Sequence, residues 1–156
     1  MNCYADSSFL AQLLVKDFAS EAFFACYRRL GRPCLPYTPL HDLEVPNGLR
    51  ARIFSAANAA GRSAARRECA EATRRLVHYF TTRCLSRTVF DWETAISSAK
   101  SLSAAHTEKI GARSLDVLHV SIAGVLNVDV FLTCDKRQAR LAKQAGFSVE
   151  LIGAEK

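Results

Sequence analysis

Long apolar runs are missing from this chain. No segment approaches the roughly 20 apolar residues that a membrane-spanning helix needs. Near Met1 there is no basic region followed by an apolar core, so we expect no secretory signal peptide. Internal repeats, low-complexity tracts and an interdomain linker are missing as well. We therefore expect one cytoplasmic domain over residues 1–156.

Closely spaced cysteine pairs are also missing, although the chain has six cysteines. No two of them lie two to four residues apart, which is the spacing that zinc sites use. Most lie among apolar neighbours in expected helices or strands, so we interpret them as reduced core thiols of a cytosolic protein, with disulfides as the alternative. The six are Cys3, Cys26, Cys34, Cys69, Cys84 and Cys134.

The composition that remains is ordinary for a globular protein, with 49% hydrophobic and 23% charged residues. The formal net charge is +6. This charge permits an anionic partner without identifying one.

Short apolar segments alternate with amphipathic helical stretches five times. The alternation predicts a three-layer α/β/α fold with a central, mostly parallel sheet of about five short strands. We expect these strands at residues 3–5, 35–38, 88–90, 128–132 and 149–152. We expect the helices to begin with Ser7 or Ser8 as a cap, and near residues 20, 39, 63, 91, 114 and 136.

Two helix boundaries carry specific expectations. Pro46 lacks an amide and crowds the carbonyl of Asp42, so the helix from Pro39 must kink there or begin only near Pro46. The apolar stripe continues on both sides, which favours the kink. Gly61 and Arg62 break the pattern, so we expect the next helix over residues 63–85, with Cys69, Thr73, Leu76, Val77, Phe80 and Cys84 facing inward.

Four carboxylates are candidates for one shared site. Asp6 and Asp135 each end a strand and begin a helix, Asp116 opens a helix, and Glu44 follows the second strand. In a parallel sheet all four can reach the same mouth. Clustered carboxylates need a counter-charge, and oxygen ligands indicate Mg²⁺ or Mn²⁺ rather than zinc. Such an ion activates water and neutralises charge on a phosphodiester.

Each of these acids also has a purely structural interpretation. Asp6 and Asp135 could be simple N-caps, as we interpret Asp91, and Asp116 could complement a helix dipole. His119, one turn after Asp116, is either a ligand or, as we favour, a hydrogen-bonded and partly buried imidazole. We interpret the other histidines as surface residues: His41, His78 and His106.

Basic residues offer two further alternatives. Lys136 and Arg137, beside Asp135, are placed to bind a substrate phosphate or to form ordinary helix surface. The arginine-rich segment 50–87 is either an RNA-binding surface or a solvated face that meets an acidic partner.

Four short motifs, taken together and in this order, carry a resemblance to a known family. They are Tyr4-Ala5-Asp6-Ser7-Ser8, Leu40-His41-Asp42-Leu43-Glu44-Val45, Leu115-Asp116-Val117-Leu118-His119 and Thr133-Cys134-Asp135. Over almost its whole length the chain resembles PIN-domain proteins, and among these the VapC-type toxin ribonucleases of type II toxin–antitoxin systems.

The resemblance implies a PIN-like fold and a Mg²⁺-dependent endoribonuclease. It implies that Asp6, Glu44, Asp116 and Asp135 hold the metal ion, that the Ser8 hydroxyl supports the site, and that Thr133 is the family's threonine before the last aspartate. It also implies an RNA substrate, a small antitoxin partner that covers the groove, and a homodimer. Where some relatives carry a further acid after the last aspartate, this chain has Gln138 and Ala139.

Two other functions remain open at this point. One is a catalytically silent PIN-fold module that binds RNA or a protein. The other is an aspartyl phosphoacceptor with Asp6 or Asp135 as nucleophile, although Asp6-Ser7-Ser8 lacks the second acid that haloacid-dehalogenase-type phosphatases carry two residues on.

Overall fold

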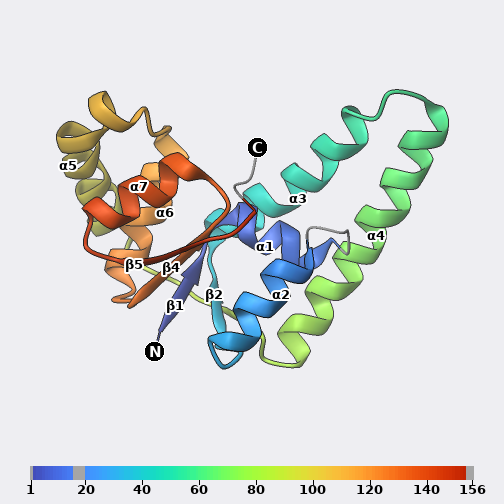
Figure 1. The fold of residues 1–156 in the computed structure, drawn as a ribbon, viewed down its shortest axis with the longest axis horizontal. Helices are drawn as coiled ribbons and strands as arrows, with labels where there is room; N and C mark the ends of the chain where they lie inside the picture. The colour runs from blue at the N-terminus through green and yellow to red at the C-terminus, as the bar shows by residue number, and fades with distance from the viewer. Residues whose placement is uncertain (1, 16–19, 154–156) are drawn as a thin grey trace.

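The computed structural model describes residues 2–15 and 20–153 (Figure 1). Its strands form parallel pairs only, in the order β1-β4-β5 and β2-β3. They are β1 (Cys3–Ala5), β2 (Leu35–Tyr37), β3 (Leu85–Arg87), β4 (Val130–Thr133) and β5 (Ser148–Leu151). The predicted α/β fold with short, parallel strands is confirmed. The described strands form two hydrogen-bonded sheets, however, rather than one. β1 and β2 lie side by side, but no ladder of main-chain hydrogen bonds joins them.

Helices cover both faces of these strands. They are α1 (Ser7–Leu14), α2 (Ser20–Arg29), α3 (Pro39–Phe54), α4 (Ala59–Thr81), α5 (Trp92–Ile110), α6 (Ser114–Val125) and α7 (Lys136–Gln144). In β1, Cys3 and Ala5 point into a core with α1 to α4, whereas Tyr4 points into a second core with α5 to α7. This alternation separates the two cores, as the pleat of a strand requires.

Several predicted boundaries were wrong, for local reasons. The helix expected from Ser63 begins at Ala59, because the Asn58 side chain accepts a hydrogen bond from the Gly61 amide and caps it. It ends at Thr81, and Arg83 then adopts a positive φ of 56°. The chain consequently enters β3 at Leu85, three residues earlier than the strand expected at 88–90.

The expected helix caps also differ in part. Asp6, rather than Ser7 or Ser8, is the N-cap of α1, and Arg113 is the N-cap of α6, which begins at Ser114. α3 is a single helix that contains Pro46, so it does not begin near that proline.

α3 and α4 form a hairpin that projects from the body of the protein (Figure 1). Ala72 is the one buried residue of α4, which is described throughout. Val77 and Thr73, which were predicted to face inward, are exposed. Most of the surface of α4 therefore stays accessible to solvent.

Other burial predictions have mixed outcomes. Cys3 and Cys26 are buried, but Cys34 is exposed, so the interpretation of the cysteines as core thiols holds only for some of them. The prediction that His41 is a surface residue was wrong, because its side chain is fully buried. Among residues 2–15 and 20–153, no helix combines the length and apolarity needed to span a membrane.

Candidate active site

All four predicted carboxylates line one open pocket of about 550 Å³. Asp6 lies between β1 and α1, Glu44 lies on α3, Asp116 lies in the first turn of α6, and Asp135 lies between β4 and α7. The carboxyl ends of the parallel strands β1 and β4 meet at this pocket, which brings together residues that are distant in the sequence. The predicted convergence of the acids is therefore observed.

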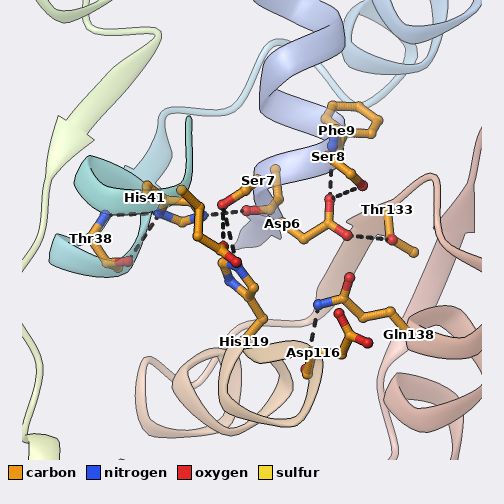
Figure 2. A network of polar contacts seen from close by, with 12 residues as sticks. Asp6, Ser7, Ser8, Phe9, Thr38, His41, Asp116, His119, Thr133 and Gln138 are labelled. Atoms are coloured by element: carbon orange, nitrogen blue, oxygen red, sulfur yellow. Dashed lines mark hydrogen bonds and ion pairs between the residues drawn. The ribbon is translucent and has the colours of Figure 1, made fainter. Parts of the chain in front are cut away.

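Asp6 is the most deeply buried of the four acids, with 1% of its surface exposed. Its Oδ1 accepts hydrogen bonds from the Phe9 amide (2.8 Å) and the Ser8 hydroxyl (2.7 Å), and its Oδ2 accepts one from the Thr133 hydroxyl (2.5 Å; Figure 2). Burial nevertheless raises the pKa of Asp6, because the hydrogen bonds only partly offset the loss of water. The site therefore holds a desolvated carboxylate whose ionised form lacks full compensation.

Asp135 both caps a helix and lines the pocket. Its Oδ1 accepts hydrogen bonds from the amides of Arg137 (2.7 Å) and Gln138 (3.2 Å), as an N-cap should. The Thr133 hydroxyl accepts from the amide of Asp135 (2.9 Å) while donating to Asp6. Capping and site formation are thus compatible, and Thr133 links the two aspartates.

Asp116 and Gln138 lie together on another side of the pocket (Figure 2). Asp116 Oδ2 accepts from the Arg113 amide at 3.0 Å, which closes the first turn of α6. Gln138 is buried, and its amide donates a long hydrogen bond of 3.4 Å to the main-chain oxygen of Asp116. The chain thus places a neutral amide in the pocket, a position that sequence reasoning noted only as a missing acid.

Glu44 points into the pocket despite the proline two residues later. Its Oε2 accepts from the Ser7 hydroxyl at 2.6 Å and lies 2.5 Å from His119 Nε2. Burial raises the pKa of Glu44, but the interaction with His119 and the hydrogen bond from Ser7 outweigh it, so the net shift is downward. Glu44 is therefore held as a carboxylate at neutral pH.

His119 connects Glu44 to the core of the protein. It is buried, and its Nδ1 lies 2.7 Å from the hydroxyl of Tyr4. Because Nε2 faces a carboxylate, Nε2 carries a proton and Nδ1 accepts from the tyrosine. Both ring nitrogens are engaged, which supports the interpretation of His119 as a hydrogen-bonded imidazole rather than a ligand.

This chain of contacts predicts a stability effect for Tyr4→Phe. The change removes the donor to His119 Nδ1 and leaves a buried acceptor without a partner, so we expect the free energy of unfolding to fall by about 1–3 kcal/mol. Urea titration monitored by circular dichroism measures it. Tyr79→Phe is the matched control: its hydroxyl donates to Leu13 O at 3.1 Å but is only part-buried, so water can replace it. Equal losses in the two variants would contradict the prediction.

The donors that line the pocket are suited to a hard cation. They are carboxylate, hydroxyl and side-chain amide oxygens. No cysteine lines the pocket within the described residues, and the histidine nitrogens are already bonded. Oxygen donors of this kind fit Mg²⁺ or Mn²⁺. In the described part of the chain, no three Asp, Glu, His or Cys side chains stand close enough together to form a ready-made ligand set. The metal-binding roles of the four acids stay predictions.

Two predicted substrate-binding residues lie beside the pocket rather than in its wall. Lys136 is exposed, and Arg137 Nη2 lies 3.9 Å from Asp135 Oδ2. Sequence reasoning missed Ser7, which hydrogen-bonds Glu44, and nothing in the spacing of residues 6–8 distinguishes the two serines.

Sequence reasoning also missed the role of His41. Its Nε2 donates to Ala5 O (2.9 Å), and its Nδ1 accepts from the Thr38 amide (2.9 Å). His41 thereby ties the end of β1 to the start of α3 behind the pocket.

The sequence was compared with protein-family models and with curated proteins, and neither comparison gave a match.

Proposed function

We propose that this protein is a Mg²⁺-dependent endoribonuclease with a PIN-like fold. The observation that carries the proposal is the pocket in which Asp6, Glu44, Asp116 and Asp135 meet, together with the desolvation of Asp6. A buried carboxylate that is costly to ionise is stabilised when a cation binds beside it. The chemistry of the site therefore favours a cation-dependent reaction.

The residues of the chain have distinct tasks in this proposal. Asp6, Asp116 and Asp135 would hold the cation directly, and Glu44 would do so directly or through water. When bound, the cation supplies positive charge to the scissile phosphate and activates the attacking water. Ser8 and Thr133 hold Asp6 through hydrogen bonds to opposite oxygens, so its carboxylate keeps one orientation. Ser7 and His119 hold Glu44 in the same manner.

The biological setting follows from the resemblance described above. We propose an RNA substrate, a role as the toxin of a toxin–antitoxin pair, a small antitoxin that covers the pocket, and a homodimer. The pocket is open and lined by acids, so an antitoxin that inserts a basic side chain would neutralise it.

A catalytically silent binding module is the second candidate. The observation that favours it is that Glu44 is already engaged by hydrogen bonds with Ser7 and His119. The two candidates differ in whether the pocket takes up a divalent cation at all.

Calorimetric titration of the purified protein with Mn²⁺ tests the proposal. We expect saturable uptake by the wild type and at least about tenfold weaker uptake by Asp6→Asn. Asparagine keeps an oxygen that can cap α1, and circular dichroism verifies that the fold is intact. Asp91→Asn is the matched control, because Asp91 is also a helix N-cap but lies outside the pocket. Identical uptake by all three proteins, or none by the wild type, would reject the metal site.

A further inference from the structure

A row of cations runs along the exposed side of α7, away from the pocket. Lys136, Arg140 and Lys143 are spaced at i, i+4 and i+7 and are all exposed, whereas Leu141 and Ala142 on the opposite face are buried. Lys136 directly follows Asp135, so the row begins at the edge of the candidate active site. With a rise of about 1.5 Å per residue, its members are separated by about 6 Å and about 4.5 Å along the helix.

The row ends in a second cavity. This cavity has a volume of about 370 Å³ and is lined by residues of α5 and α7. The two helices pack against each other (Figure 1). Its wall contains Lys109, Arg140, Lys143 and His106, and no acidic side chain among the residues described. Lys109, Arg140 and Lys143 form no ion pair within the described part of the chain. The cavity is therefore a concave site of uncompensated positive charge.

Helix dipoles do not account for this arrangement. Lys109 and Lys143 lie in the last turns of α5 and α7, where the dipole favours cations. Lys136, however, is in the first turn of α7, where the dipole disfavours a cation, and Arg140 is in the middle of that helix. The row thus crosses the whole length of α7, so the helix dipole alone does not explain it.

We propose that Lys136, Arg140, Lys143 and Lys109 bind the backbone phosphates of a single-stranded RNA that extends from the active-site pocket into the α5–α7 cavity. This inference rests on the proposed function for the identity of the anion. A flexible single strand can follow a line of cations spaced in this way, and binding releases counterions from its phosphates. The α5–α7 surface, rather than the α3–α4 hairpin, is therefore the main RNA-binding surface.

The arginine-rich α3–α4 hairpin is the alternative RNA-binding surface. Several of its arginines already have partners within the protein: Arg75 bonds Glu71 and the main-chain oxygen of Leu14, and Arg52 pairs with Glu68. Arg67 donates a hydrogen bond to the hydroxyl of Ser63. Arg66, Arg67 and Arg74 lie exposed on α4. These three arginines match Lys109, Arg140 and Lys143, the three cations of the cavity wall, in number and charge, so they provide a control of equal net charge.

The test measures binding of a fluorescein-labelled single-stranded RNA by anisotropy, in an Asp116→Asn background that prevents cleavage. We expect the triple variant Lys109→Gln, Arg140→Gln, Lys143→Gln to bind at least about tenfold more weakly. We also expect its slope of log affinity against log salt to fall by about 2, because each lost phosphate contact removes about 0.7. The control triple variant Arg66→Gln, Arg67→Gln, Arg74→Gln should change the affinity by less than about threefold.

Three outcomes would overturn the proposal: equal weakening by both triple variants, greater weakening by the α4 variant, or an unchanged salt slope. Binding of labelled poly-glutamate of matching charge is measured in the same way. If the α5–α7 triple variant loses as much affinity for poly-glutamate as for RNA, the surface binds an acidic protein partner instead of RNA. Binding and cleavage are measured separately. A wild-type protein that cuts no RNA would reject the proposed nuclease activity, whereas the location of the RNA-binding surface would still be decided by the binding data.

Discussion

Asp116→Asn is expected to lower kcat/KM for RNA cleavage at least about 100-fold while leaving the fold intact. The substitution removes one negative charge from the wall of the pocket. It keeps an oxygen that can accept the hydrogen bond from the Arg113 amide, so the first turn of α6 is preserved. Cleavage of a fluorescently labelled RNA in the presence of Mg²⁺ measures the effect, and circular dichroism verifies the fold.

Asp91→Asn is the control for this experiment. Asp91 caps α5 through the Glu93 amide and the Thr94 hydroxyl, so both substitutions convert a helix-end aspartate to asparagine. Because Asp91 lies outside the pocket, its variant should cleave RNA at the wild-type rate. Cleavage that survives Asp116→Asn unchanged would remove the carboxylate site as the source of activity.

Acidification from pH 7 to pH 4 is expected to destabilise the protein through His41. Burial lowers the pKa of His41 to about 3, and the nearby His119 adds to this effect. The unfolded chain binds a proton near pH 6.5, whereas the folded protein does not. The contribution of His41 to stability is therefore complete above about pH 6.5 and is lost as the pH falls toward 3, by up to about 1.4 kcal/mol per pH unit.

Urea titrations of wild type and His41→Gln at pH 7, 6, 5 and 4 measure this slope. The variant loses the bonds to Ala5 and Thr38 and is less stable at pH 7, but its free energy of unfolding should vary less with pH. His78→Gln, at an exposed histidine, should keep the wild-type slope. The raised pKa of Asp6 makes the opposite contribution to the pH dependence of stability. Asp6 is present in both proteins, so the difference in slope between wild type and His41→Gln reports the contribution of His41. Parallel slopes for wild type and His41→Gln would contradict the prediction.

Patterns local to a few residues predicted much of the fold. The strand–Asp–helix transitions at Asp6 and Asp135 were predictable because an apolar run, a capping acid and a helical stripe follow one another in each case. Their convergence on one pocket was also predictable, because the carboxyl ends of parallel strands share an edge.

Features set by tertiary contacts were not predictable. Nothing local reveals that His41 is buried, since its partners include Ala5 from a distant strand. The start of α4 was missed because the cap at Asn58 outweighs the unfavourable glycine at position 61. The exposure of Val77 follows from the way the hairpin projects, which a helical stripe alone does not indicate.

The double use of Asp6 and Asp135 has an evolutionary consequence. Both carboxylates hold the beginning of a helix, so a descendant that gave up the chemistry would still be selected to retain them for folding. Glu44 supports no helix end, and its side chain is bonded to Ser7 and His119 at the pocket. Among descendants of this chain, drift at position 44 would therefore be the earliest mark of a lost activity.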